Sequence, residues 1–375
     1  MSMTFSAEQD ELRSSVRRFL EQKSKSADVR RLMETDEGYD PAVWSQMAEQ
    51  LGLQGLALPE EHGGSGYGFI EQIAVIEEMG RALLCAPYFS TVVLAATALL
   101  ESGDEAAQKD LLPDIADGST IGTLAWVEDP ASWDTSAISA TARRSGDTYA
   151  IDGAKTLVLD GHVANLLLVV AQTDNGPSLF AVEADATGLS RRKLETLDMT
   201  RKLAAVEFSG TPARLIAEEG AATRILERTL QHAVVALSAE QVGGAQKCLD
   251  MSVDYAKLRV QFGRPIGSFQ AIKHKCADML LEVESAKSAA YYAAWAIADN
   301  TEEVPVVASL AKAYCSDAFA SAATETIQIH GGIGFTWEHD AHLYYRRAKS
   351  TEQFLGSPAA HRDTLAGLLL AGEGA

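Results

Sequence analysis

A cluster of basic side chains at a bend is the first place in this sequence where chemistry could occur. The bend lies in residues 259–279, and its basic side chains are Arg259, Arg264, Lys273 and Lys275. The 375-residue chain has a formal net charge of -20, so this cluster is a local exception. Ser268 stands where a hydroxyl could cap the helix that follows. Positive groups beside a helix N-terminus suit an anion, although the same pattern also describes a solvated helical hairpin.

Long helical patterns must position this bend. Apolar residues recur at helical spacing in four stretches, which are 225–257, 269–299, 304–328 and a fourth that begins near His339 or Asp340 and breaks around 356–358. The third stretch ends at His330 and the two glycines after it. The economical arrangement is a bundle of four long antiparallel helices over residues 219–375.

The first 118 residues also have helical patterns, opening near Ser6. The glycine-rich segment 59–68 interrupts them. It is not preceded by a strand and lacks the Lys-Ser/Thr pair of a phosphate-binding loop, so a connection is the better interpretation. We therefore expect an N-terminal helical domain over residues 1–118.

The pattern changes to short apolar runs between turn signals over residues 119–218. The expected strands are 123–127, 149–155, 166–172, 179–183 and 204–208. The segment has no G-x-G-x-x-G motif and no βαβ pattern, so it is not a dinucleotide-binding fold. The sequence predicts a middle antiparallel β domain, and the whole chain is of the α+β class.

Composition excludes several functions. An apolar content of 47% permits a sizeable core, and the acidic balance argues against nucleic acid or a membrane surface as partner. The four cysteines form no C-x-x-C pair, which fits reduced thiols and gives no metal motif. There is no apolar run near the start and no stretch long enough to span a membrane, so a cytoplasmic protein is expected.

The order of helical, β and helical regions, with its motifs, closely resembles the acyl-CoA dehydrogenase family along essentially the whole chain. The motifs are RVQFGRPIGSFQA at 259–271, QIHGGIGFT at 328–336, PEEHGGSG at 59–66 and IDGAK at 151–155. The resemblance implies FAD-dependent oxidation of an acyl-CoA thioester to a 2-enoyl-CoA, with electrons passed to an electron-transfer protein. It also implies a tetramer.

The resemblance places FAD across a subunit interface, with its adenosine diphosphate held by the neighbouring chain. The residues that match this half-site are Arg259, Phe262, Gln270, Gln328, Gly331 and Gly332. A guanidinium suits pyrophosphate charge, and glycines let a ligand approach the backbone closely. The alternatives are a surface amide for Gln270 and an ordinary helix stop for the two glycines.

The half-site for the flavin ring departs from the family pattern. Residues 126–130 read WVEDP where members commonly have Thr-Glu-Pro. Leu157 and Leu159 stand where members commonly have a Trp and a Thr.

The catalytic base of the family removes the proton α to the thioester carbonyl, which requires a carboxylate. Leu355 and Ala233 occupy its two known positions, and neither can accept a proton. Glu240, in an apolar stretch that would raise its pKa, and Glu352 are the remaining candidates. His330 and His339, in contrast, are expected to be structural.

Four functional hypotheses follow. The leading one is the smaller, base-deficient subunit of a heteromeric bacterial enzyme acting on dicarboxylic, branched or steroid-derived acyl-CoA esters. The second is a self-sufficient homotetrameric dehydrogenase that uses Glu240 or Glu352. The third is a flavin-free scaffold or acyl-CoA-binding protein, and the fourth is a flavin monooxygenase on the same fold.

Overall fold

The computed structural model describes residues 5–133, 135, 137–146 and 148–372. Within these ranges, no helix combines the length and the apolar character needed to cross a membrane. The chain forms two compact units. The first unit contains the residues up to 30, residues 69–84 and the residues from 234 onward, and the second contains residues 31–68 and 85–233.

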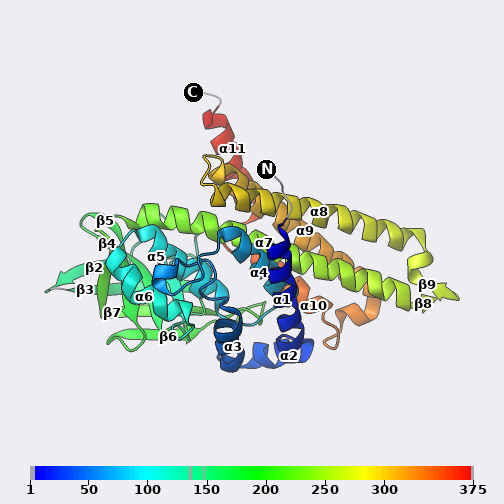
Figure 1. Cartoon of the computed structure of the whole chain (residues 1–375), viewed down its shortest axis with the longest axis horizontal. Helices are drawn as coiled ribbons and strands as arrows, with labels where there is room; N and C mark the ends of the chain where they lie inside the picture. The colour runs from blue at the N-terminus through cyan, green and yellow to red at the C-terminus, as the bar shows by residue number, and fades with distance from the viewer. Residues whose placement is uncertain (1–4, 134, 136, 147, 373–375) are drawn as a thin grey trace. The chain divides into compact units, whose positions relative to one another are not determined.

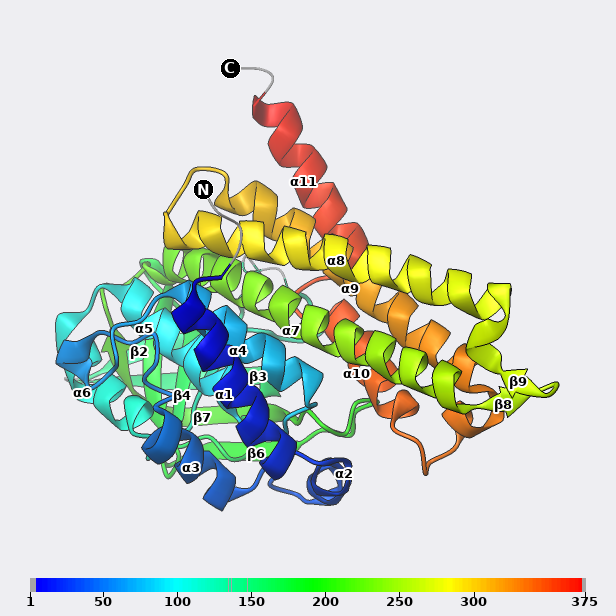
Figure 2. The same ribbon diagram turned by 45° about the vertical axis from the view of Figure 1, so that its right-hand side comes forward.

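The first unit is helical (Figure 1). Its elements are α1 (Ala7–Lys23), the start of α2 (Ser26–Glu34), α4 (Phe69–Arg81), most of α7 (Ala222–Leu258), α8 (Gln270–Ala298), α9 (Val304–His330), α10 (Ala341–Gln353) and α11 (Pro358–Gly372). The helices α8 and α9 lie side by side in both views (Figures 1 and 2), and α10 and α11 pack on α9. The predicted helical bundle is confirmed, although its fourth helix is two shorter helices divided at residues 354–357.

Local chemistry explains where these helices begin. The Ser6 hydroxyl accepts from the Gln9 N–H and the Gln9 side chain accepts from the Ser6 N–H, so α1 starts with a capping box. The prediction that Ser268 caps α8 is wrong. Ser268 ends a short 3₁₀ turn, η3 (Ile266–Ser268), and extended Phe269 precedes α8 without a side-chain cap.

Two glycines allow α4 and α7 to cross closely. A Cβ atom on Gly80 would lie 2.1 Å from the backbone oxygen of Glu240, and one on Gly243 would lie 1.8 Å from the backbone oxygen of Glu77. Both distances are far below van der Waals contact. Only glycine fits at either position, and this crossing fixes the part of α7 that carries Glu240.

The second unit joins short helices to a β domain. Its helical elements are the end of α2, α3 (Pro41–Leu51), η1 (Glu60–His62), the π-helical η2 (Phe89–Ala96), α5 (Thr97–Ser102), α6 (Glu105–Ala116) and the start of α7. Its strands are β1 (Gly122–Ala125), β2 (Thr141–Ser145), β3 (Thr148–Leu159), β4 (Leu166–Thr173), β5 (Gly176–Glu183), β6 (Leu189–Lys193) and β7 (Leu203–Ile216).

The sheet runs in the order β1-β4-β2-β3-β7-β5, with β6 added to β7. A further β4–β5 pairing closes it on itself. Most pairings are antiparallel as predicted, but β1 and β2 pair with β4 in parallel. The strands β2 and β6 were not predicted, because each exposes basic side chains and lacks a continuous apolar face.

Candidate functional site

The predicted anion-binding bend is a two-stranded hairpin between α7 and α8, in the first unit. It consists of β8 (Val260–Gln261) and β9 (Arg264–Pro265), followed by η3. Phe262 lies at its tip with 91% of its surface exposed and a left-handed φ of 54°. Arg259 and Gln270, at the two ends of this hairpin, are also exposed.

The second predicted strip follows α9 and forms the short turn η4 (Gly331–Phe335). Gln328 is exposed, and Gly331 adopts a left-handed φ of 62°. A Cβ atom on Gly331 or Gly332 would meet no described atom within 4 Å. The backbone of this strip is therefore open to a molecule from outside the chain.

Aromatic stacking brings the two strips to the same end of the bundle. The Tyr255 ring, one turn before Arg259, stacks on the His330 ring with centroids 4.3 Å apart. His330 in turn packs at 4.3 Å against His339, and its Nδ1 lies 2.7 Å from the Thr326 carbonyl oxygen. Burial lowers the pKa of His330. These contacts fit the structural role expected for both histidines.

The four basic side chains of the bend divide into two classes. Lys275 forms an ion pair with Glu325 of α9, and the Arg264 guanidinium lies 4.2 Å from the centre of the Phe269 ring. The side chains of Arg259 and Lys273 form no ion pair or hydrogen bond among the described residues. An exposed guanidinium, an aromatic ring, amides and open glycine backbone are donors and surfaces that fit the adenosine diphosphate of FAD.

The positions expected for the base are apolar and buried. Leu355 is only 6% exposed and has a left-handed φ of 61°, whereas Ala233 is completely buried in α7. An aliphatic side chain offers no lone pair to a substrate proton, so neither position can act as a base.

Glu240 is buried in α7 and engaged with another helix. Its Oε1 accepts from a guanidinium nitrogen of Arg347 in α10 at 2.8 Å, and both side chains are less than a tenth exposed. A strong charge-assisted bond of this kind stabilises the carboxylate and occupies one of its oxygens. The arrangement suits a tie between α7 and α10 better than proton abstraction.

Glu352 is also paired, but within one helix. Its Oε2 accepts from Lys349 at 2.8 Å, one turn earlier in α10. Lys312 of α9 donates to the backbone oxygens of Thr351 and Gly356, both at 3.0 Å, and is completely buried. Lys312 therefore stabilises the short connection between α10 and α11, which contains Leu355. Sequence reasoning missed it, although a lone lysine in the apolar pattern of α9 was a usable signal.

The β domain of the second unit contains a second polar group that sequence reasoning missed. The Glu128 carboxylate accepts from Lys155 Nζ at 2.6 Å, from the Ser139 and Ala140 N–H groups at 2.8 and 3.0 Å, and from the Ser139 hydroxyl. Burial alone would raise the pKa of Glu128, but the hydrogen bonds from Lys155 and Ser139 outweigh it and hold that pKa below its usual range. Glu128 therefore links the segment that follows β1 to Lys155 of β3.

The leucines that replace the expected flavin contacts lie in β3. Leu157 is half-buried at a bulge with a left-handed φ of 52°, whereas Leu159 is buried. Trp126 is also buried, and its indole N–H has no hydrogen-bond partner among the described residues. Neither leucine side chain can donate a hydrogen bond to a flavin nitrogen.

Comparison with known proteins agrees with this architecture. Three acyl-CoA dehydrogenase family domains match the chain, the N-terminal domain at residues 6–119, the middle domain at 123–210 and the C-terminal domain at 221–370. The acyl-CoA dehydrogenase IpdE2 of Mycobacterium tuberculosis is 36% identical over 357 residues, which cover 95% of each chain.

Solved structures match over nearly the full length. A variant of the Tcur3481-Tcur3483 steroid ACAD is 33% identical with a TM-score of 0.89, covering 98% of this chain and 99% of the other. The ChsE4-ChsE5 complex of M. tuberculosis is 28% identical with a TM-score of 0.90, covering 99% of each chain. Butyryl-CoA dehydrogenase of Megasphaera elsdenii is 28% identical with a TM-score of 0.92, covering 99% of this chain and 100% of the other.

The fold is therefore that of the flavoprotein oxidoreductases that act on acyl-CoA. With all three domains matched in order, the chain belongs to the acyl-CoA dehydrogenase family.

Proposed function

We propose that this chain is the FAD-clamping, base-deficient subunit of a hetero-oligomeric acyl-CoA dehydrogenase. The observation that carries the proposal is a contrast within the first unit. The residues that match the adenosine diphosphate clamp are exposed and available, whereas Leu355 occupies a position of the base and Glu240 is buried in an ion pair with Arg347.

Each clamp residue has a physical role toward FAD. The Arg259 guanidinium would neutralise pyrophosphate charge, the Phe262 ring would cover an apolar face of the adenosine, and the Gln270 and Gln328 amides would supply hydrogen bonds. The chemistry that FAD supplies when bound is acceptance of the β hydrogen of the substrate as a hydride. The carboxylate that takes the α proton would come from a related partner chain.

Exposed apolar side chains support an oligomer, and we propose a tetramer. Near the hairpin and η4, Leu258, Phe262 and Phe335 are 80%, 91% and 83% exposed. A second set lies on α8 and α11, where Leu281 and Leu370 are 69% and 70% exposed. Large exposed apolar side chains in groups mark interaction surfaces.

The comparisons support the kind of partner and substrate. Two of the matched structures are named as pairs of proteins, Tcur3481-Tcur3483 and ChsE4-ChsE5, and the first is described as a steroid ACAD. Another match, 28% identical with a TM-score of 0.93, is titled an electron transferring flavoprotein of Acidaminococcus fermentans. We therefore propose a steroid-derived or branched acyl-CoA ester as substrate and an electron-transfer protein as acceptor.

Co-purification tests the proposal. The chain would be expressed alone and together with a related dehydrogenase chain that carries the missing glutamate. We expect stoichiometric FAD and acyl-CoA oxidation only in the co-expressed complex. Stoichiometric FAD and dehydrogenation by the chain alone would overturn the hypothesis.

The alternative is a self-sufficient homotetramer that uses Glu240 or Glu352. Glu240→Gln and Glu352→Gln keep the side-chain shape while removing the proton acceptor. If either carboxylate is the base, its variant abolishes bleaching of the flavin by acyl-CoA. Unchanged bleaching in both variants removes this alternative.

A further inference from the structure

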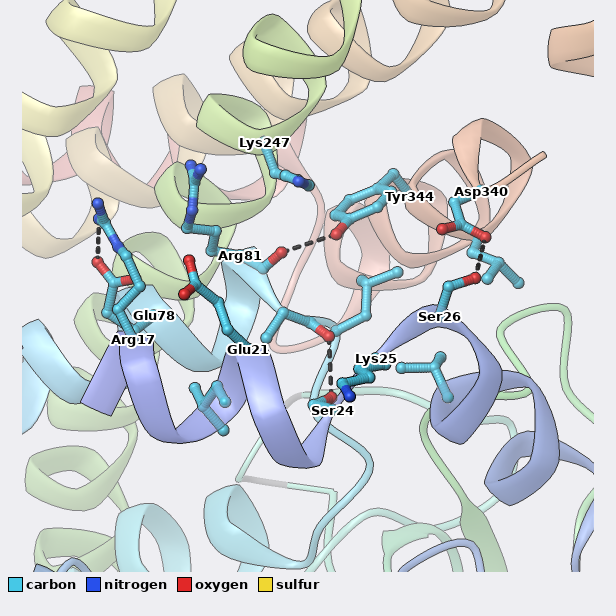
Figure 3. A pocket seen from close by; sticks show the side chains of 15 residues that line it. Arg17, Glu21, Ser24, Lys25, Ser26, Glu78, Arg81, Lys247, Asp340 and Tyr344 are labelled. Atoms are coloured by element: carbon cyan, nitrogen blue, oxygen red, sulfur yellow. Dashed lines mark hydrogen bonds and ion pairs between the residues drawn. The ribbon is translucent and has the colours of Figure 1, made fainter. Parts of the chain in front are cut away.

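A cavity of about 350 Å³ lies in the first unit, among α1, α2, α4, α7 and α10 (Figure 3). Its volume is at the lower end of the range for small-molecule sites. It contains none of the residues that we assign to FAD or considered for the base.

The floor of the cavity, its most buried part, is apolar. Leu20, Leu83 and Leu343 are at most 3% exposed, and Val29 lies beside them. Tyr344 also lines the cavity, and its hydroxyl hydrogen is already used because it donates to the Arg81 carbonyl oxygen at 2.7 Å. Apolar surface of this kind favours a hydrocarbon group over water.

Several charges around the cavity are already neutralised. Arg17 pairs with Glu78 at 2.6 Å, and Arg81 pairs with Asp250 of α7 at 2.6 Å. Asp340 accepts from Arg30 at 2.7 Å and from the Ser26 hydroxyl at 2.6 Å. These groups hold the walls together and have little charge left for a ligand.

Three lining charges remain unpaired. The side chains of Lys25, Lys247 and Glu21 form no ion pair or hydrogen bond within the described parts of the chain. Lys247 is half-buried and extends from α7 toward Tyr344, while Lys25 lies on the opposite side near Ser24 (Figure 3). The available charge is therefore two cations and one anion around an apolar floor, in a protein whose net charge is -20.

We propose that this cavity binds a small amphiphilic carboxylate, with its hydrocarbon part on Leu20, Leu83 and Leu343 and its carboxylate between Lys247 and Lys25. The excess of unpaired positive charge disfavours a cationic ligand. The apolar part of the lining disfavours a simple inorganic anion, which would lose hydration there without compensating contacts. Glu21 weakens the site, because its carboxylate repels the ligand.

Calorimetric titration of octanoate into the full-length protein, in the assembly in which it is purified, tests this site. Lys247→Ala is expected to weaken octanoate binding roughly fivefold, the effect of losing one partly exposed charge pair. Glu21→Gln is expected to tighten binding. Lys23→Ala is the matched control, because Lys23 ends α1 between Glu21 and Lys25 but does not line the cavity, and it is expected to leave binding unchanged.

Two further probes separate charge from hydrophobicity. Octan-1-ol should bind more weakly than octanoate, and octylamine should bind most weakly. Far-ultraviolet circular dichroism establishes that each variant is folded, so a change in affinity reports on the site. Equal octanoate affinity for the wild type and Lys247→Ala, or equal affinity for octanoate and octylamine, would overturn the assignment.

Discussion

The α7–α8 hairpin and the α7–α10 interface use polar residues in opposite ways. At the hairpin, Arg259 and Gln270 are exposed, and the Arg259 side chain has no partner in the described chain. At the interface, Glu240 and Arg347 are buried and paired at 2.8 Å. Polar groups left available suit an external ligand, whereas polar groups satisfied internally hold helices together. The difference predicts that ligand affinity and stability depend on separate residues.

The largest effect is expected from Arg347→Ala, which leaves the buried Glu240 carboxylate without this ion-pair partner. We expect a loss of about 3–5 kcal/mol in the free energy of unfolding, measured by chemical denaturation. The double variant Glu240→Gln/Arg347→Met removes both charges and should cost less. A loss below about 1 kcal/mol for Arg347→Ala would contradict a structural role for the pair.

Arg259→Ala, in contrast, should weaken FAD binding and leave the stability of the fold nearly unchanged. Loss of a charge-assisted bond to pyrophosphate is expected to weaken FAD binding by the assembled enzyme by about 10–100-fold, with a stability change within about 0.5 kcal/mol. Flavin release measured by fluorescence and denaturation of the same samples provide both values. Lys273→Ala is the control, since Lys273 is an exposed basic residue of the same bend. Similar losses of FAD in both variants would show that only general positive charge matters.

Glu128→Gln tests the satisfied polar group of the β domain. Because the pKa of Glu128 is depressed in the folded state, the ionised carboxylate stabilises the protein above its unfolded pKa. This contribution is lost as the pH falls through the folded pKa. The variant should be about 2 kcal/mol less stable at pH 7, and less sensitive to acidification below about pH 4.5.

Thermal unfolding from pH 7 to pH 3 gives the comparison, with Glu207→Gln as the control. Glu207 is an exposed carboxylate on β7 of the same sheet. Parallel stability curves for the wild type and Glu128→Gln would mean that the carboxylate contributes nothing as an ion.

Substitutions of Phe262 are expected to have smaller effects. The Phe262 ring is exposed, and its backbone has a strained left-handed conformation. Phe262→Ala removes the ring and keeps a left-handed non-glycine residue, whereas Phe262→Gly also relieves the strain. We expect both to weaken FAD binding, and the glycine variant to be up to about 1 kcal/mol more stable than the alanine variant. Unimpaired FAD binding by both variants would show that the Phe262 ring does not contribute to FAD binding.

The smallest effect is expected for Glu352→Gln. Its pair with Lys349 spans one helical turn on a partly exposed face, so the free energy of unfolding should change by less than about 0.5 kcal/mol. Acyl-CoA-dependent flavin bleaching by the complex should be unchanged. A loss of bleaching would show instead that the Glu352 carboxylate takes part in catalysis.

Local signals predicted much of the fold. The periodicity of 269–299 and 304–328 corresponds to α8 and α9 within a few residues, and the start near Ser6 is a capping box. These features depend on neighbours three or four positions away. The strands β2 and β6 were missed because their stability comes from pairing with distant strands and not from their own apolar content.

The candidate site was predictable only in residue type. Motifs singled out Arg259, Phe262 and Gln270, but not that the Phe262 ring would be almost fully exposed on a left-handed backbone. The partner of Glu240 is 107 positions away, so its ion pair follows from the packing of α10 against α7. Such contacts depend on the rotation of each helix about its axis, which periodicity defines too coarsely.

The close crossing of α4 and α7 limits how this sequence can diverge. An added methyl group at Gly80 or Gly243 would lie nearest to a backbone carbonyl oxygen of the facing helix, although at Gly80 it would also meet the Cγ atom of Glu240. A clash with a side chain can be relieved by a second substitution that makes the neighbour smaller, but no substitution shortens a carbonyl group. We therefore expect that random mutagenesis will not find single-residue suppressors of Gly80→Val or Gly243→Val at the opposing positions, and that both glycines are entrenched in any descendant that keeps this crossing.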